Sequence, residues 1–297
     1  MELDVFRKSL DYFLKQAKDK GVAPDVGLAT NGILSDEQIK WIAQRMDSVQ
    51  ISLDGTQEIH NFQRPYNEKN GSGNSFETVC HSVKLFLTLG VAVTIHCVIT
   101  SKGMKSIPEI TEFFVHNFPG AAMHFEPVCE CGRAMELAHE FSSQTLFTEG
   151  FSAAEQIAGS AGSEIFYSGT GFDITELRES FCGVSVPNFT VTPEGFVTAC
   201  HEVAELSHPL SSQLVYGHLD NQNGQFVFDQ DKIRRLQDWG KEPSAKCRNC
   251  FAQYHCGGEC LSKKLQTTNV ARKSLLGERC MINKELLRRR IFTKLFI

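Results

Sequence analysis

The chain of 297 residues has no apolar run of the roughly 18–20 residues that a membrane-spanning helix needs. Its first residues show no basic segment followed by an apolar one, so no signal peptide is visible. Basic residues are not in excess: 30 Lys and Arg stand against 35 Asp and Glu, which argues against a nucleic-acid partner. We therefore expect a cytoplasmic protein with no nucleic-acid and no membrane partner.

Such a chain also lacks the oxidising surroundings in which disulfide frameworks persist. Cysteine is nevertheless abundant, with 11 residues, and an odd number leaves one thiol unpaired in any all-disulfide scheme. Close cysteine spacing in a reducing compartment is typical of metal binding or catalysis. The rest of the composition, 41% hydrophobic and 22% charged, is that of a globular protein, and the length predicts two domains.

Seven cysteines form an array near the carboxyl terminus. They follow the patterns C-x12-G-x4-C and C-x2-C-x5-C-x3-C, and the last cysteine comes after nineteen more residues. Short loops of this kind bring thiolates around an iron–sulfur cluster. Two cubane clusters with four ligands each need eight ligands, and the array supplies seven. One iron is therefore left for another side chain, a substrate or water. The alternative is a pair of zinc sites of the ribbon type. The array consists of Cys182, Cys200, Cys247, Cys250, Cys256, Cys260 and Cys280.

The first 128 residues repeat one unit, an amphipathic helix followed by a turn and an apolar strand. Ser35 with Gln38, and Ser106 with Glu109, have the spacing of capping boxes. The alternation predicts an α/β fold whose parallel sheet is covered by helices, with four strands and without the first strands of a barrel. We predict helices over 4–20, 35–46, 74–90 and from 106, and strands over 25–30, 48–53, 91–100 and 121–128.

The second half has another pattern. A helix is predicted around 143–158, in a stretch that we interpret as a bridge. Residues 188–200 predict a hairpin that turns at Pro193–Gly195, and a helix over 231–239 leads into the cysteine-rich loop. A basic helix ends the chain. We divide the chain into a partial barrel (1–135), a bridging region (136–180) and a small α+β domain (181–297).

The array resembles the SPASM domain, the auxiliary-cluster extension of radical S-adenosylmethionine (SAM) enzymes, and all seven cysteines match the family pattern. The resemblance implies a partial (β/α) barrel of the radical SAM type missing its first strands, followed by a small α+β SPASM domain. It also implies two auxiliary [4Fe–4S] clusters. The implied ligands are Cys182, Cys200 and Cys260 for the first cluster, and Cys247, Cys250, Cys256 and Cys280 for the second.

Residues 51–65 resemble the fourth-strand signature SLDG-x4-H-D/N-x2-R of the same superfamily. Side chains at the carboxyl end of a parallel strand lie where such folds bind ligands. The resemblance implies that Ser52 and Asp54 contribute to the SAM pocket, and that Arg64 is suited to hold a carboxylate at two points. The alternative is a simple turn at Asp54, with His60 as a helix-capping residue.

Asn31 belongs to an ATNG element that ends the preceding strand, as a TNG element commonly does in this superfamily. Two interpretations of Asn31 remain: it contacts SAM, or it belongs to an ordinary β-turn. Cys129 and Cys131 are candidates for the missing cluster ligand, although their C-x-C spacing matches nothing in the family pattern and favours partly buried thiols. Cys80 on a helix stripe and Cys97 within a strand are predicted to be core residues.

The sequence contains no C-x3-C-x2-C, the motif that holds the SAM-cleaving cluster in this superfamily, and no GGEP element. We interpret the sequence as beginning inside a longer enzyme, and we expect this chain to bind iron–sulfur clusters without cleaving SAM. His201 follows Cys200 where the sulfatase-maturing members have an aspartate proposed to accept a substrate proton. A histidine is a candidate base or iron ligand there.

The resemblance implies an oxidoreductase-type maturase that modifies a peptide or protein side chain by radical chemistry. It would use S-adenosyl-L-methionine and an electron donor such as a flavodoxin or ferredoxin. Two alternatives stay open: a non-catalytic iron–sulfur partner for electron transfer or peptide binding, and a zinc-binding interaction module.

Overall fold

A computed structural model describes residues 3–65, 75–128, 143–169, 175, 177–185, 188–241, 247–266 and 273–296. By its internal contacts the chain divides into two compact units. The first unit comprises Met1–Glu126 with Ala154–Ile165, and the second comprises Pro127–Ala153 with Phe166–Ile297.

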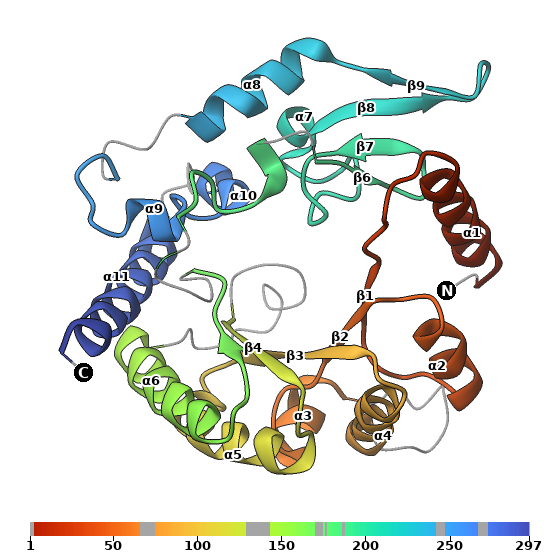
Figure 1. The fold of residues 1–297 in the computed structure, drawn as a ribbon. Coiled ribbons are helices and arrows are strands. Elements are labelled where there is room, and N and C mark those ends of the chain that lie inside the picture. The colour runs from red at the N-terminus through yellow and green to blue at the C-terminus, as the bar shows by residue number, and fades with distance from the viewer. Residues whose placement is uncertain are drawn as a thin grey trace. The chain divides into compact units, whose positions relative to one another are not determined.

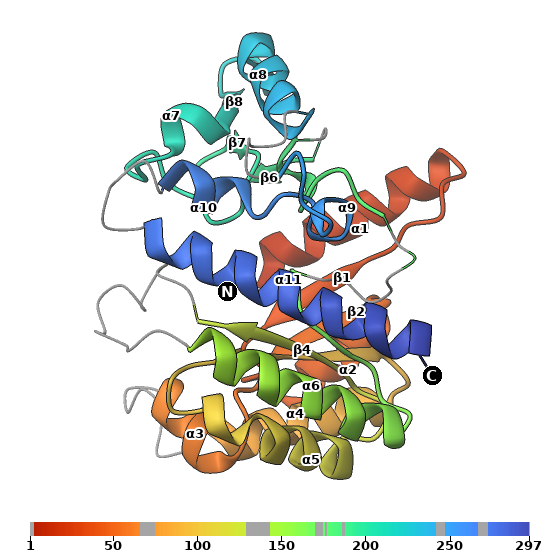
Figure 2. The same cartoon turned by 90° about the vertical axis from the view of Figure 1, so that its left-hand side faces the viewer.

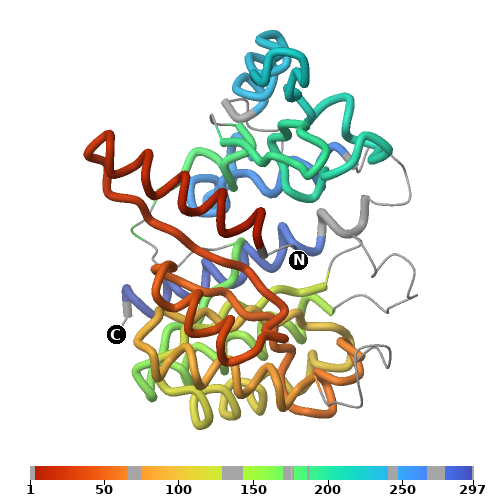
Figure 3. The backbone as a smooth tube through the Cα atoms, turned by 90° about the vertical axis from the view of Figure 1, so that its right-hand side faces the viewer, coloured from red at the N-terminus to blue at the C-terminus, as the bar shows by residue number. Residues whose placement is uncertain are grey.

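The first unit alternates helices and strands, and this order can be followed along the chain in Figures 1 and 3. The α/β fold expected from the sequence is confirmed. The strands are β1 (Gly27–Thr30), β2 (Ser48–Ser52), β3 (Ala92–Ile99) and β4 (Ala122–Pro127), and the helices are α1 (Leu3–Asp19), α2 (Asp36–Ala43), α3 (Gln57–Gln63), α4 (Ser75–Thr88) and α5 (Ile107–Asn117).

The sheet has one strand more than the four that we predicted. Helix α6 (Gln144–Ser160) leads to the short β5 (Ile165–Phe166), and the strand order is β1-β2-β3-β4-β5. Strand β2 pairs in parallel with both β1 and β3. A strand of two residues is too short to show a period-two pattern, so the sequence could not reveal β5.

Two predicted capping boxes have different outcomes. At α2 the box forms, because Ser35 Oγ accepts the Gln38 N–H at 3.3 Å and Gln38 Oε1 accepts the Ser35 N–H at 2.8 Å. At α5 the prediction is wrong: Ser106 makes no side-chain cap bond. A 3₁₀ turn over Met104–Ser106 leads directly into α5 and holds Ser106 at φ −101° and ψ 10°, away from the extended conformation of a capping residue.

The two faces of the sheet differ in burial. Alternate residues of β2, β3 and β4 are fully buried, and Figures 1 and 2 show α3, α4 and α5 on one side of the sheet. Helix α4 packs against β2 and β3. The residues between the buried ones are half-buried. The buried set is Val49, Ile51, Val93, Ile95, Cys97, Ile99, Met123, Phe125 and Pro127.

The second unit contains an antiparallel sheet in the order β6-β7-β8-β9. The predicted hairpin is confirmed as β6–β7, which turns where the Gly195 N–H donates to the Thr192 carbonyl at 2.9 Å. Gly195 has φ 82°, a conformation that favours glycine. The strands are β6 (Thr190–Val191), β7 (Phe196–Thr198), β8 (Val215–Asp220) and β9 (Gln225–Phe228).

Helices complete this unit, and two of them were predicted from the sequence: the helix that leads into the cysteine-rich loop and the basic helix at the end. Within the described residues, no helix combines the length and the apolar character needed to cross a membrane. The helices are α7 (Ser211–Leu214), α8 (Gln230–Lys241), α9 (Gln253–Cys256), α10 (Leu261–Gln266) and α11 (Lys273–Phe296), with a 3₁₀ turn over Gly183–Ser185.

Candidate functional site

Three of the seven array cysteines approach one another in the second unit. Cys182 precedes the 3₁₀ turn, Cys200 follows β7, and Cys260 directly precedes α10. Desolvation raises the pKa of the Cys200 thiol, and the nearby charges of Glu202 and Cys260 raise it further. Desolvation, followed by the charges of Cys260 and Glu202, also raises the pKa of Cys182. The structure therefore brings this first group of thiols within electrostatic reach of one another.

The other four cysteines form a second group. The Cys250 N–H donates to the Cys247 carbonyl at 3.0 Å, so these two residues flank one tight turn. Desolvation raises the pKa of Cys280 on α11, and the charges of Cys250 and Cys247 contribute to the increase. Desolvation and then the charge of Glu259 raise the pKa of Cys256 at the end of α9. Glu259 also raises the pKa of Cys280, so one carboxylate lies near both thiols.

A buried polar network supports this second group. Arg279 Nε donates to Glu259 Oε1 at 2.8 Å, and the two residues are only 7% and 8% exposed. Asn283 Nδ2 donates to Cys256 Sγ at 3.1 Å and to Glu259 Oε2 at 3.2 Å. Arg279 Nη2 donates to Ser168 Oγ at 3.2 Å. Because a buried charge needs partners, these contacts fix the cysteine-bearing loop against α11.

Glycine permits a close backbone approach beside Cys182. Gly257, which ends α9, has φ 63°, and a Cβ there would lie 2.5 Å from the backbone nitrogen of Phe181. Close by, the Arg178 N–H donates to the Tyr254 carbonyl at 2.7 Å. The loop that carries Cys256 therefore lies directly against the segment that carries Cys182.

The donor set fits iron–sulfur clusters. Thiolates are the ligands that such clusters use. The structure brings Cys260 near Cys182 and Cys200, and Cys280 near Cys247 and Cys250, while Cys256 shares the neighbouring Glu259 with Cys280. Within the described part of the chain, no three His, Cys, Asp or Glu side chains converge on a site for a single metal ion. The role of each cysteine as a ligand stays a prediction.

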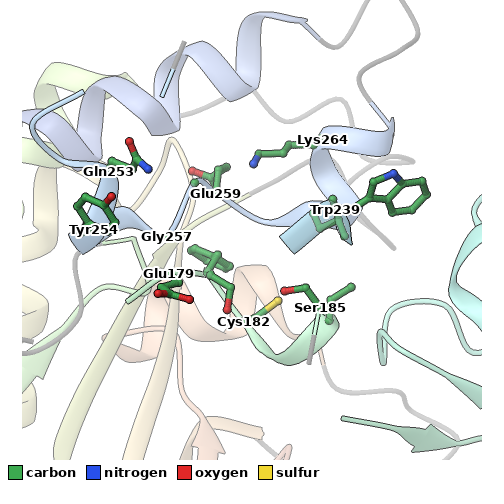
Figure 4. A pocket seen from close by; sticks show the side chains of 14 residues that line it. Glu179, Cys182, Ser185, Trp239, Gln253, Tyr254, Gly257, Glu259 and Lys264 are labelled. Carbon is green, nitrogen blue, oxygen red and sulfur yellow. The ribbon is translucent and has the colours of Figure 1, made fainter. Parts of the chain in front are cut away.

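A cavity of about 280 Å³ opens beside Cys182, and Figure 4 shows Glu259 and Lys264 on the side away from Cys182 and Ser185. Trp239 of α8 also lines it. Pockets for drug-sized ligands measure roughly 300–1,000 Å³. The cavity therefore suits a side chain or a short segment of a larger molecule.

In the first unit, the half-buried face of the sheet carries polar groups. Ser52 of β2 is in register with His96 of β3, and the His96 and His124 rings lie 4.8 Å apart. Desolvation lowers the pKa of His96, and the charge of Glu126 opposes this shift. Sequence reasoning missed His96, His124 and Glu126. The available signal was the alternation of polar and apolar residues in β3 and β4, because strands of a parallel sheet buried on both faces are apolar throughout.

Asp54, at the carboxyl end of β2, is bound by Arg64. Arg64 Nε donates to Asp54 Oδ2 at 2.7 Å and Nη2 donates to Oδ1 at 3.3 Å. Asp54 is 2% exposed and also accepts the Val98 N–H at 3.0 Å. The Asp54 N–H donates to His60 Nδ1 at 3.2 Å. The carboxylate that Arg64 holds at two points is therefore that of Asp54, and these contacts join the end of β2 to α3 and β3.

The two remaining candidates are exposed. Asn31 Oδ1 accepts the Ile33 N–H at 3.1 Å, the contact that defines an Asx turn. His201 is exposed next to the buried Cys200, whereas Glu202 is half-buried. The carboxylate of Glu202, which sequence reasoning did not select, is the one that affects the first group of thiols.

The other cysteines do not join either group. Cys97 is fully buried in β3, as predicted. Cys80 on α4 is half-buried, and desolvation raises the pKa of its thiol to about 12. Cys129 and Cys131 lie outside the described residues.

No protein-family model matches the chain. A segment is 34% identical over 89 residues to a cysteine-type anaerobic sulfatase-maturating enzyme of Clostridium perfringens, and it covers 29% of this chain and 23% of that enzyme. The chain thus matches less than a quarter of the length of its curated relatives.

The fold is similar to that of several solved structures, of which two are described. Native anSMEcpe with bound AdoMet superposes with a TM-score of 0.71 at 18% identity, covering 100% of this chain and 81% of that chain. Streptococcus suis SuiB bound to precursor peptide SuiA superposes with a TM-score of 0.58 at 13% identity, covering 87% of this chain and 66% of that chain. At these identities the likeness shows the fold.

Proposed function

We propose that this chain, whose fold is similar to that of a sulfatase-maturating enzyme, is a radical SAM/SPASM maturase-like iron–sulfur protein acting on a peptide or protein side chain. The observation that carries the proposal is the grouping of the seven thiols. Bound [4Fe–4S] clusters supply one-electron chemistry. Cys182, Cys200 and Cys260 would hold one cluster, and Cys247, Cys250, Cys256 and Cys280 the other.

The polar face of β2–β4 is the proposed place for SAM. A SAM molecule presents amino, carboxylate and hydroxyl groups, which need hydrogen-bonding partners. Ser52 supplies a hydroxyl there, and His96 remains neutral near pH 7 because desolvation lowers its pKa. The role proposed for Asp54 and Arg64 is to position the end of β2, since each is already bound to the other. Asn31 remains a proposed contact at the end of β1.

The cavity beside Cys182 is the proposed site for a substrate side chain. Its volume of about 280 Å³ suits such a group, and the SuiB structure, which shares the fold, contains a precursor peptide. His201 is the proposed proton acceptor, because it is exposed next to Cys200 and an imidazole can take up a proton near neutral pH. An electron donor such as a flavodoxin or ferredoxin is proposed as a partner.

Serine substitutions test the two ligand groups separately. Anaerobically reconstituted wild-type protein should contain about eight irons and eight acid-labile sulfides per chain. Cys200→Ser in the first group and Cys250→Ser in the second should each lower the iron content towards about four, and the double variant should lose nearly all of it. Cys80→Ser is the matched control, since Cys80 lies in the first unit and outside both groups.

Iron losses that do not follow the two groups would contradict the proposal. An example is a loss of all iron on Cys250→Ser alone, in a protein that remains folded by circular dichroism. A preparation that binds stoichiometric zinc and no sulfide would favour the zinc-binding module instead.

A further inference from the structure

The first group of thiols lacks one ligand for a cubane. This inference rests on the proposed function, under which two four-coordinate clusters require eight ligands and the array supplies seven. The second group has four cysteines, so the missing ligand belongs to the first. The iron in question is the one not held by Cys182, Cys200 or Cys260.

Glu202 is held at this group by a buried hydroxyl. Ser262, which is 0% exposed, donates from Oγ to Glu202 Oε2 at 3.1 Å. The same Oγ lies 3.2 Å from Cys260 Sγ. One hydroxyl group therefore contacts both the Glu202 carboxylate and a thiol of the group, which places the carboxylate beside that thiol.

The backbone also fixes the position of Glu202 next to Cys200. It lies two residues after Cys200, within a turn closed by the Val203 N–H, which donates to the Cys200 carbonyl at 2.9 Å. Val203 is 0% exposed and anchors this turn in the core. In support, the charge of Glu202 raises the pKa of both Cys182 and Cys200, so the carboxylate is near all three thiols.

We propose that the Glu202 carboxylate is the eighth cluster ligand and binds the iron that Cys182, Cys200 and Cys260 leave without a thiolate. A carboxylate oxygen is an anionic donor that iron accepts, although a softer thiolate suits a cluster iron better. The iron bound to Glu202 is therefore the most easily lost of the eight. His201 is exposed, whereas Glu202 is half-buried and shares Ser262 with Cys260.

Oxidative loss of iron tests this assignment. When ferricyanide oxidises a [4Fe–4S]²⁺ cluster, one Fe²⁺ leaves and one electron passes to ferricyanide, so that a paramagnetic [3Fe–4S]⁺ cluster remains. In the reconstituted chain of 297 residues, one of the two clusters should convert first. Glu202→Cys should slow this conversion about ten-fold, and Glu202→Gln should accelerate it about ten-fold. The rate is read from the EPR signal and from the released iron.

Glu205→Gln is the matched control, because Glu205 lies three residues further on, is exposed, and its carboxylate accepts a hydrogen bond from the neighbouring Ser207 hydroxyl at 3.0 Å. Its conversion rate should equal that of the wild type. Wild-type rates in both Glu202 variants, with about eight irons bound, would overturn the assignment of Glu202 and leave the two clusters intact. The assignment of Glu202 would also be overturned if the double variant Cys129→Ser/Cys131→Ser changed the conversion rate and neither Glu202 variant did. A preparation without iron or sulfide would overturn both proposals at once.

Discussion

At the scale of single residues, side chains that are not ligands themselves set the surroundings of the candidate ligands. Asn283 donates to Cys256 Sγ, and Arg279 neutralises the buried Glu259 next to that thiol. In the first unit, Arg64 and His60 hold Asp54 at the end of β2. Partners of this kind orient ligands and tune a bound group without touching substrate.

Removing the hydrogen bond to Cys256 should change one reduction potential. Hydrogen bonds to cluster sulfurs stabilise the more negative, reduced state, so Asn283→Ala should lower the midpoint potential of one of the two clusters. A potentiometric titration followed by EPR measures this shift. Ser168→Ala is the control, because the Ser168 hydroxyl accepts from Arg279 in the same network, whereas the hydrogen bond to Cys256 Sγ comes from Asn283. Equal potentials in Asn283→Ala and the wild type would contradict a tuning role.

His60 should make the free energy of unfolding depend on pH. Desolvation lowers its pKa from 6.5 to about 4, and its Nδ1 accepts the Asp54 N–H, which requires a neutral ring. His60 is therefore protonated below pH 6.5 in the unfolded chain, but only below about pH 4 in the folded chain. This stabilisation is present above pH 6.5 and is lost as the pH falls towards 4. Between pH 7 and 5 the loss should be about 2 kcal/mol.

Denaturant unfolding of the wild type and His60→Leu measures this effect. The variant leaves the Asp54 N–H unpaired and should be less stable at pH 7, but it has no ring to protonate. The difference between the two proteins should therefore shrink as the pH falls. A constant difference between pH 7 and 5 would contradict the role given to His60.

At the scale of helices and strands, the sequence revealed the elements with strong periodicity. The helix of α2 with its capping box, the strands β2 and β3, and the β6–β7 hairpin were all predicted. Helix α3 and strand β5, with 7 and 2 residues, are too short to show a period. The cysteines were found because their spacing is local. His96 and Glu202 were missed because only the folded chain brings them to their neighbours.

Alanine substitutions at two neighbouring glycines in the loop after α9 should differ in their effect on stability. Gly257 and Gly258 have φ 63° and 81°, so alanine is strained at both positions. At Gly257 a Cβ would also meet the backbone of Phe181 at 2.5 Å, whereas at Gly258 the nearest atom is Lys264 Nζ, the end of a long side chain, at 3.3 Å. Gly258→Ala should cost about 1 kcal/mol and Gly257→Ala about 3 kcal/mol or more. Thermal unfolding of the reconstituted proteins compares the two, and equal losses would contradict the close approach.

At the scale of the whole molecule, the two units carry different chemistry. The first has the polar sheet face that we propose for SAM, and the second has the thiols and the cavity beside Cys182. The sequence contains no C-x3-C-x2-C. Two proposals are compatible with these features: a maturase that acts with a SAM-cleaving cluster, and an electron-transfer partner.

The polypeptide with this sequence should not cleave SAM. Incubation with SAM and dithionite should give no 5′-deoxyadenosine above the level seen with protein that has been depleted of iron. Chromatography with mass detection measures the product. Repeated turnover by this chain would show that one of its own clusters binds and cleaves SAM.

The most direct test of the central claim is Mössbauer spectroscopy of the full chain after anaerobic reconstitution with ⁵⁷Fe and sulfide. The account predicts quadrupole doublets of [4Fe–4S]²⁺ clusters that together account for about eight irons per chain. A spectrum showing only iron outside clusters, in a protein that retains zinc at its cysteines, would contradict it.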